Sequence, residues 1–188
     1  MTQSSNPRDA RQVRTRAKLL RALLTLLERE PFEDISVRAI AEAAGVGYAT
    51  FFRHYPDKMA LLDDLAADEI AELLGRAMPL FSADDSRRAC VALCEYVAER
   101  RTLWRALLTG GAAPILRAHF IAGARRIAAD FGTPESTTGS PIDLRVTHAT
   151  AATLEILAWW LGHDESFTVD RIAAILDRLV IAPILAEP

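Results

Sequence analysis

A short helix, a glycine turn and a second short helix, predicted within residues 35–58, constrain the fold of this chain more than any other feature. Ser36 is a favourable N-cap because its hydroxyl can accept a hydrogen bond from a first-turn amide, and apolar residues then recur at helical spacing. Gly45 ends this helix, since glycine adopts the left-handed conformation without a steric penalty. The second helix is expected from about Gly47 to Tyr55. This pattern is typical of a helix-turn-helix, whose second helix lies in the DNA major groove.

The second helix of this motif has one apolar face and one polar face. Phe51 and Tyr55 point one way, and the opposite face offers donors, acceptors and a fixed cation. Arginine can bond a phosphate or a guanine edge through two parallel hydrogen bonds, and hydroxyl groups can donate to phosphates. The alternative is that two short helices around a glycine only pack together, as in many all-helical proteins. The predicted DNA-binding residues are Ser36, Arg38, Gly47, Tyr48, Ala49, Thr50, Phe52, Arg53, His54 and Lys58.

The run AIAEAAGVGYATFFRHYPDKMALL at residues 39–62 resembles the DNA-binding region of the TetR (tetracycline repressor) family of transcriptional regulators. With the approach at residues 7–35, the resemblance covers roughly the first third of the chain. It implies a dimeric DNA-binding regulator, most often a repressor, whose C-terminal domain binds a small effector and pairs through its last two helices. The residues that carry the resemblance are Ile40, Ala41, Ala44, Gly45, Val46, Thr50, Phe52, His54, Tyr55, Lys58, Leu61 and Leu62.

Two residues depart from the pattern of that family. Gly47 stands where members usually carry serine or threonine, so the second helix lacks a side-chain cap, although glycine is an acceptable N-cap. Phe52 stands where members usually carry tyrosine, which removes a hydroxyl that commonly bonds DNA. These departures favour an alternative function, a helical ligand-binding or interaction module that keeps the helix-turn-helix fold but has little DNA affinity.

Basic side chains crowd the first half of the first helix, and acidic side chains follow the motif. We predict phosphate contacts from Arg8, Arg11, Arg14, Arg16, Lys18 and Arg21, against the alternative of a solvated face. The buried face of this helix is expected to hold Val13, Ala17, Leu20, Leu24 and Leu27. A connecting helix begins near Lys58, where a cation opposes the helix dipole and is expected near a phosphate. Its solvated face is expected to hold Asp63, Asp64, Asp68, Glu69 and Glu72.

The composition predicts an all-α protein. Alanine and leucine dominate, β-branched residues are sparse, and no segment alternates apolar and polar residues for long. We expect a helix-turn-helix domain at 1–62 and an effector-binding and dimerisation domain at 63–188. The first carries 10 Lys/Arg against 7 Asp/Glu and the second 12 against 18, which places positive charge on the DNA-binding part. About nine helices are expected, near 7–29, 36–45, 47–55, 57–78, 86–99, 101–109, 113–131, 143–162 and 168–185.

The last two predicted helices carry more apolar residues than one buried face requires, which favours a dimer interface over a purely internal core. The predicted interface residues are Leu157, Trp160, Leu161, Ile172, Ile175, Leu176 and Leu179. A ligand pocket is expected among the helices of residues 63–162, although residues of each candidate type are more often packed core residues or solvated charges than ligand contacts. The candidate ligand-binding residues are Tyr96, Trp104, Leu108, His119, Phe120, Arg125 and Glu155.

Other classes of function find little support in the sequence. No catalytic triad, paired carboxylates, phosphate loop or metal-ligand spacing is present, so we expect no enzyme, metal or cofactor. Cys90 and Cys94 share a helix face and are expected to be buried thiols rather than a disulfide. No uncharged apolar run approaches the ~18–20 residues that cross a bilayer, and we expect a cytoplasmic protein.

Overall fold

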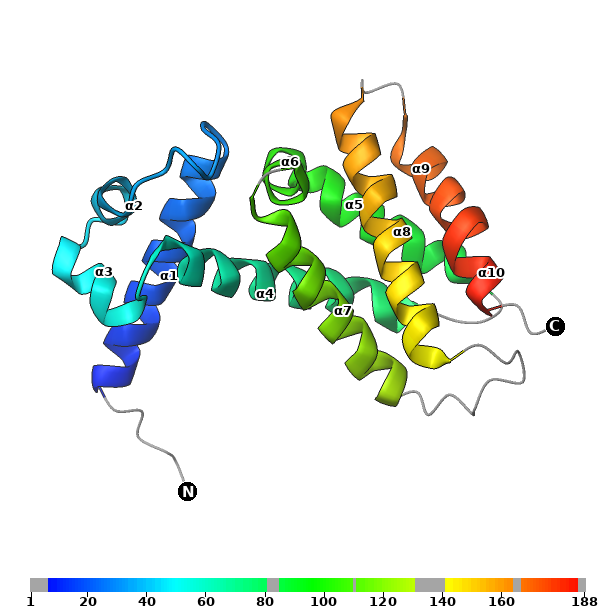
Figure 1. The fold of residues 1–188 in the computed structure, drawn as a ribbon, viewed down its shortest axis with the longest axis horizontal. Coiled ribbons are helices and arrows are strands. Elements are labelled where there is room, and N and C mark those ends of the chain that lie inside the picture. The colour runs from blue at the N-terminus through cyan, green and yellow to red at the C-terminus, as the bar shows by residue number, and fades with distance from the viewer. Residues whose placement is uncertain (1–6, 81–84, 110, 131–140, 164–166, 186–188) are drawn as a thin grey trace. The chain divides into compact units, whose positions relative to one another are not determined.

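The computed structural model of this chain describes residues 7–80, 85–109, 111–130, 141–163 and 167–185, and within these ranges it contains helices and no strands. The prediction of an all-α fold is confirmed. Figure 1 shows α1 (Pro7–Leu27), α2 (Val37–Ala43), α3 (Tyr48–His54), α4 (Lys58–Ala77), the 3-10 turn η1 (Met78–Leu80), α5 (Ser86–Glu99), α6 (Arg101–Thr109), α7 (Ala113–Asp130), α8 (Ile142–Gly162), α9 (Val169–Leu176), the π-helical turn η2 (Asp177–Ile181) and α10 (Ala182–Leu185).

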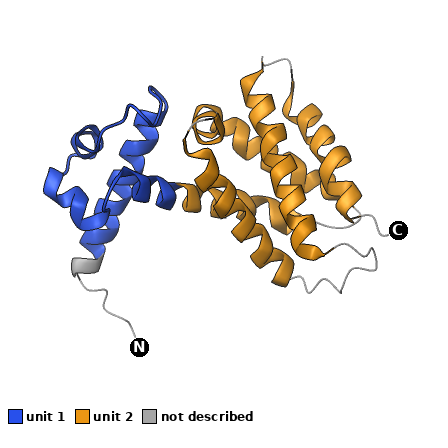
Figure 2. Ribbon diagram, viewed as in Figure 1, with its two compact units in different colours: residues 1–65 blue, residues 66–188 orange. Residues whose placement is uncertain are grey.

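The chain divides into two compact units, residues 1–65 and residues 66–188 (Figure 2). The division falls inside α4, so this helix contributes residues to both units. The two functional domains expected on either side of residue 62 remain a prediction. In the part of the chain that the structure describes, no helix is long and apolar enough to cross a membrane.

The second half of α1 packs into the core of unit 1, and its first half does not. Leu19, Leu23 and Leu27 are buried, together with apolar residues of the three following helices. The prediction that Val13 and Ala17 are buried is wrong, because both are exposed, Val13 to 66%. Helical spacing extends an apolar stripe in both directions along a helix, but only the second half of this stripe has neighbours to pack against.

Unit 2 is a bundle in which α5 packs on α9, and both α6 and α7 pack on α8. Its largest buried side chains include Tyr96, Trp104 and Trp160. The last helix, expected to be continuous over 168–185, is interrupted by η2. We attribute the π-helical turn to Pro183, which has no amide proton to donate to the carbonyl four residues earlier and whose ring crowds that carbonyl.

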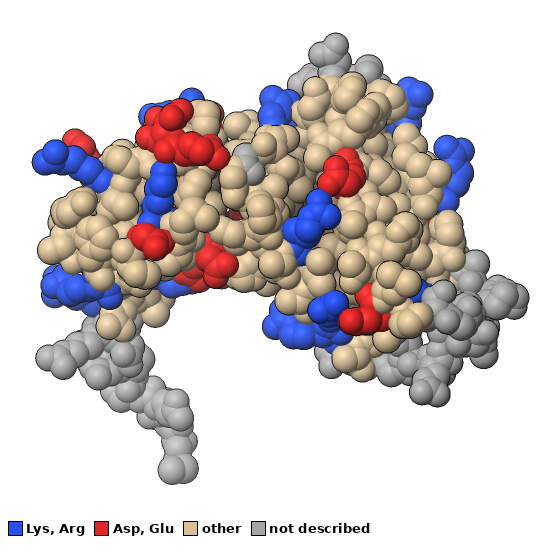
Figure 3. Space-filling view, in the orientation of Figure 1, with Lys and Arg blue, Asp and Glu red and all other residues tan. Residues whose placement is uncertain are grey.

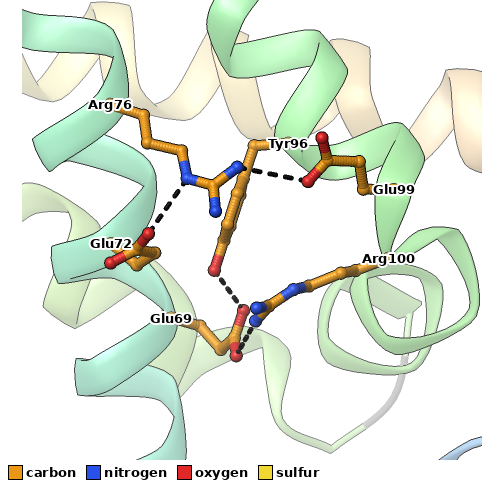
Figure 4. Close-up of polar contacts among 6 residues, drawn as sticks. All are labelled: Glu69, Glu72, Arg76, Tyr96, Glu99 and Arg100. Carbon is orange, nitrogen blue, oxygen red and sulfur yellow. Dashed lines mark hydrogen bonds and ion pairs between the residues drawn. The ribbon is translucent and has the colours of Figure 1, made fainter.

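A polar network joins α4 to α5 inside unit 2 (Figure 4). Tyr96 Oη donates to Glu69 Oε2 at 2.8 Å, and Arg100 Nη1 donates to Glu69 Oε1 at 2.6 Å. Arg76 lies over the same tyrosine ring and bonds Glu72 and Glu99 at 3.0 and 3.2 Å. The prediction that Glu69 lies on a solvated face is wrong, since this residue is only 5% exposed. Burial, the bond to Glu69 and the charge of Glu69 together raise the pKa of Tyr96 above its ordinary value.

Candidate DNA-binding surface and ligand cavity

The turn between α2 and α3 has the geometry that the sequence predicts. Ser36 Oγ accepts a hydrogen bond from the amide of Ala39 at 3.1 Å and caps α2. Gly45 has φ +63°, and the amide of Val46 donates to the carbonyl of Ala41 at 3.0 Å, which closes the end of the helix. Gly47 then caps α3 with its backbone alone. The end of α2 and the start of α3 are therefore determined by backbone conformation, and the start of α2 by the hydroxyl of Ser36.

Helix α3 is anchored by one face and exposes the other. Phe51 and Tyr55 are buried, as predicted. Tyr48 is 57% exposed and Phe52 is 45% exposed, and their rings meet edge to face with centroids 5.1 Å apart. Arg53 is exposed and donates through Nη2 to the hydroxyl of Thr50 at 2.9 Å, which orients the guanidinium along the helix. The outward face thus presents two aromatic rings and one cation.

A three-residue clamp holds α3 against α1 and α4. Arg16 bonds Asp64 through two parallel hydrogen bonds of 2.7 and 2.6 Å, and the hydroxyl of Tyr55 donates to the same carboxylate. Burial acts to raise the pKa of Asp64, but the hydrogen bonds from Arg16 and Tyr55 and the charge of Arg16 outweigh it, so the pKa is lowered. Arg16 and Asp64 are therefore partners of each other, and a phosphate contact from Arg16 stays a prediction.

Lys58 is committed to the protein backbone rather than to an external phosphate. Its Nζ donates to the carbonyls of Phe32, Glu33 and Ile35 at 3.0, 2.9 and 2.8 Å, which uses all three ammonium protons. The ammonium also lies 4.7 Å from the centre of the Phe32 ring. The argument that Lys58 needs a phosphate to offset the helix dipole fails, since these carbonyls supply the negative partners. The lysine fastens the start of α4 to the segment between α1 and α2.

The remaining predicted DNA-binding residues lie on the surface of unit 1. Arg38 on α2 and Ala49 on α3 are exposed, and His54 is half-buried with its ring 6.4 Å from that of Tyr55. Figure 3 shows basic side chains around the end of unit 1 that carries α2 and α3. The exposed cations of α1 are Arg11, Arg14, Lys18 and Arg21, while nothing is described of the side chain of Arg8.

Unit 2 contains an apolar cavity of about 390 Å³. It lies between α4, α5, α7, α8 and the end of the chain from α9 to α10. Of the seven predicted ligand-binding residues, only Phe120 lines it. The lining residues are Leu74, Ala77, Met78, Ala89, Cys90, Leu93, Phe120, Ala124, Ile127, Ala128, Ile142, Arg145, Val146, Ala149, Thr150, Thr153, Leu176, Ile181, Ile184 and Leu185.

The other six predicted ligand-binding residues have different surroundings. Tyr96 and Trp104 pack in the core, and Leu108 and His119 are half-buried outside the cavity lining. Arg125 pairs with Asp143 at 3.0 Å, and Glu155 with Arg117 at 2.8 Å, and all four side chains are substantially exposed. These six residues do not line the described cavity, because aromatic size and charge alone do not distinguish a cavity wall from a core or a surface, and their contact with a ligand stays a prediction.

Three polar lining residues escaped the sequence reasoning, although a signal for them exists. Arg145, Ala149 and Thr153 recur at a spacing of four on α8, and Thr150 joins the same face. Arg145 is the one cation of α8 among the residues that line the cavity.

The predicted dimer interface is largely internal. Five of its seven residues, Leu157, Trp160, Leu161, Ile172 and Leu176, are buried within their own chain. An apolar helix face can pack against the core of its own chain or against a partner. Here most of the apolar residues of the last two predicted helices pack against the core. Ile175 is half-buried and Leu179 is 59% exposed.

The two cysteines of the chain are buried in unit 2. Cys90 and Cys94 are free and buried, and burial raises the pKa of each thiol to about 12, so both stay protonated near neutral pH. The prediction of buried thiols is confirmed. Among the described residues, no three histidine, cysteine or carboxylate side chains gather in a way that could hold a metal ion.

Two sequence comparisons each match part of this chain. The family model for bacterial regulatory proteins of the TetR family matches residues 19–65. HTH-type transcriptional regulators of Mycobacterium bovis and Mycobacterium tuberculosis are 27% identical to this chain over 116 residues, 59% of this chain and 54% of each relative. The matched region thus spans about half the length of these curated relatives.

The fold resembles solved structures along nearly its whole length. A TetR regulator from Streptococcus agalactiae has a TM-score of 0.67 at 20% identity, covering 92% of this chain and 97% of that one. A TetR-family regulator from Syntrophomonas wolfei has a TM-score of 0.71 at 16% identity, covering 92% and 95%. FadR from Thermus thermophilus, a TetR-family repressor solved with lauroyl-CoA, has a TM-score of 0.60 at 18% identity, covering 88% and 93%. Residues 19–65 thus match the TetR family model, and the fold is similar to that of TetR-family regulators along nearly the whole chain.

Proposed function

We propose that this chain is a homodimeric, sequence-specific DNA-binding regulator of transcription, which represses from an inverted-repeat operator and is released by a small apolar or amphipathic molecule. The observation that carries the proposal is the anchored α3, whose outward face presents Tyr48, Phe52 and Arg53 while Phe51 and Tyr55 fix its position. A rigidly held helix with an exposed polar and aromatic face suits major-groove reading.

The DNA contacts we propose are narrower than those predicted from the sequence. Arg38 and Arg53 are the exposed cations of the motif, and the exposed cations of α1 add phosphate attraction. Lys58 is withdrawn from this set because the backbone occupies its donors. Ser36 and Gly47 serve as caps whose neighbouring amides can approach phosphates.

A dimer is supported by the exposed apolar side chains of α8 and α9. Leu144 and Trp159 lie on one face of α8 with the half-buried Ala151 and Ala152 between them, and Leu179 extends outward from η2. Small residues flanked by large ones allow two helices to approach closely. This face replaces the interface predicted from the sequence. Two-fold pairing through it presents two copies of α3 to two half-sites about 34–36 Å apart.

Release by a ligand is supported by the position of α4. In unit 1, this helix carries Lys58 and Asp64, which fasten it to the helix-turn-helix, and in unit 2 it supplies Leu74 and Ala77 to the cavity wall. A ligand that favours one position of α4 therefore shifts the population of DNA-binding conformers. DNA and ligand then oppose each other reciprocally, with a coupling of roughly 1–3 kcal/mol. The lauroyl-CoA in the Thermus thermophilus structure is amphipathic, with an apolar acyl chain and a charged coenzyme A group.

Selection from a pool of random DNA duplexes at low and at moderate salt tests the proposal. The expected result is an inverted repeat that remains enriched at the higher salt, because base contacts survive when phosphate attraction is screened. Uniform binding that disappears with salt contradicts the proposal.

The second candidate function, a helical ligand-binding module without useful DNA affinity, is favoured by one observation. Helix α3 has no side-chain cap at Gly47, and Phe52 offers no hydroxyl to DNA. Under this alternative, no sequence is enriched and the cavity still binds ligands.

A further inference from the structure

The cavity of unit 2 is lined almost entirely by hydrocarbon, with one charged residue among its described walls. That residue is Arg145, near the start of α8. It is half-buried, and its guanidinium donates to the carbonyl of Ile184 in α10. The arginine forms no ion pair with a carboxylate of the described residues, unlike Arg76, Arg100 and Arg117, which each have at least one. A cation beside an apolar cavity without an anion is incompletely compensated.

Two hydroxyl groups accompany this cation along the same helix. Thr150 and Thr153 line the cavity and are only 2% and 3% exposed. With a rise of about 1.5 Å per residue, they lie roughly 7.5 and 12 Å along α8 from Arg145. Apolar side chains of α4, α5 and α7 fill the wall opposite this helix.

These observations define the shape and polarity of a ligand. We propose that the cavity binds an elongated organic monocarboxylate, with its carboxylate on Arg145, its apolar body along α8, and a second hydrogen-bonding group near Thr150 and Thr153. Arginine matches a carboxylate through two parallel hydrogen bonds. A dianionic phosphate on this single cation leaves an uncompensated negative charge against hydrocarbon, which disfavours it. That this ligand controls DNA binding rests on the proposed function, whereas its binding to the cavity does not.

Calorimetric titration of the full chain with four matched ten-carbon probes tests this inference. The probes are decanoate, its methyl ester, decylamine and ω-hydroxydecanoate. The acids are expected to bind roughly 10- to 100-fold more tightly than the ester and the amine, because a charge-assisted hydrogen bond to Arg145 is lost in both. The hydroxy acid is expected to bind several-fold more tightly than decanoate, since its far end can bond the threonine hydroxyls.

Variants locate the two polar contacts. Arg145→Met is expected to abolish the preference for the acids, and Arg145→Lys is expected to restore part of it, because lysine keeps the charge but not the paired geometry. Thr150→Val with Thr153→Val is expected to remove only the advantage of the hydroxy acid. The thermal unfolding midpoint without ligand identifies any variant that has lost its fold. If Arg145→Met does not fold, the acid preference of Arg145→Lys still tests whether the charge binds the carboxylate.

Three results overturn the inference: equal affinity for acid, ester and amine; an acid preference that persists in Arg145→Met; or no binding of any probe. DNA selection on the same ligand-free protein separates this outcome from the proposed function. Acid binding without sequence-selective DNA binding contradicts the regulator, and DNA selection without acid binding contradicts only the ligand class.

Discussion

Gly45 is the residue on which the geometry of the helix-turn-helix depends most directly. Its φ of +63° lies in the left-handed region, where any Cβ is strained even though no atom lies within 4 Å of the position that a Cβ takes. Gly75, inside α4, also has open space but adopts a helical backbone. The two glycines therefore form a matched pair that separates backbone strain from steric contact.

Gly45→Ala is expected to lower the free energy of unfolding by about 1–2 kcal/mol, because alanine is strained in the left-handed conformation. Gly75→Ala is expected to raise it by about 0.5–1 kcal/mol, since alanine is the better helix former. Chemical denaturation of both variants checks this. A shift of the same sign in both argues against a left-handed turn at Gly45.

Asp64 makes the stability of unit 1 depend on pH in the acidic range. Its pKa is lowered from 3.8 in the folded chain, so its contribution to stability is fully present above that value and is lost as pH falls through the lower folded pKa. Asp64→Asn is expected to cost about 1–2 kcal/mol at neutral pH through weakened hydrogen bonds. Unfolding measured from pH 7 to pH 2 is expected to show the two proteins converging in acid. A constant difference at every pH contradicts the clamp.

Residue-level features that depend on near neighbours could be predicted from the sequence, and distant pairings could not. The Ser36 cap and the Gly45 turn follow from rules that act within four residues, and the buried positions of Phe51 and Tyr55 follow from helical spacing. Lys58 reaches carbonyls more than 20 residues away, and its donors could equally have faced phosphate. A charge pattern gives the polarity of a helix face but not the partner of each charge.

At the scale of elements, α4 is held from both ends by polar contacts. In unit 2, the buried carboxylate of Glu69 receives hydrogen bonds from Tyr96 and Arg100 (Figure 4). Both donors come from α5 or the residue after it. The network therefore fixes the position of α4 on α5 next to the cavity, and a change in its bonds is a route by which ligand binding can move α4.

Tyr96→Phe is expected to destabilise unit 2 by about 1–3 kcal/mol, because the buried Glu69 oxygen loses its donor. Glu99→Gln, in the exposed part of the same network, is expected to change stability by less than about 0.5 kcal/mol. Thermal and denaturant unfolding measure both. Equal effects of the two substitutions contradict a buried, hydrogen-bonded role for Glu69.

The boundaries of the helices could be predicted from hydrophobic periodicity and capping residues in the sequence. Which apolar faces pack in the core and which stay exposed could not. The expected helix at 86–99 has the bounds of α5, and the one at 143–162 differs from α8 by one residue. Helices α8 and α9 are apolar on several faces. On α8, Trp160 is buried and Trp159 is exposed, and the spacing of the apolar residues does not predict which of the two faces the core. Which face of α8 and α9 is buried is determined by α5, α6 and α7, which pack against these two helices.

At the scale of the whole molecule, the account requires a dimer. Leu179→Glu is expected to raise the dimer dissociation constant roughly 10-fold or more, because a charge is buried at the proposed interface. Leu80→Glu, at an exposed leucine of η1, is the control and is expected to leave the constant unchanged. Sedimentation equilibrium gives both values. A dimer that tolerates the first substitution as well as the second shows that the chains pair elsewhere or not at all.

The measurement that tests the central claim most directly is the salt dependence of affinity for the enriched duplex, compared between the native chain and three alanine variants. Arg38→Ala and Arg53→Ala are expected to weaken binding about 10-fold and to reduce the slope of log affinity against log salt by roughly one each if they contact phosphate. Should Arg53 bond a guanine edge, the slope stays and the base preference at one position relaxes instead.

Arg88→Ala, which removes an exposed cation of α5 in unit 2, is the control and is expected to change neither affinity nor slope. Affinity and slope that are the same in the native chain and in both motif variants contradict the assignment of α2 and α3 as the DNA-binding surface.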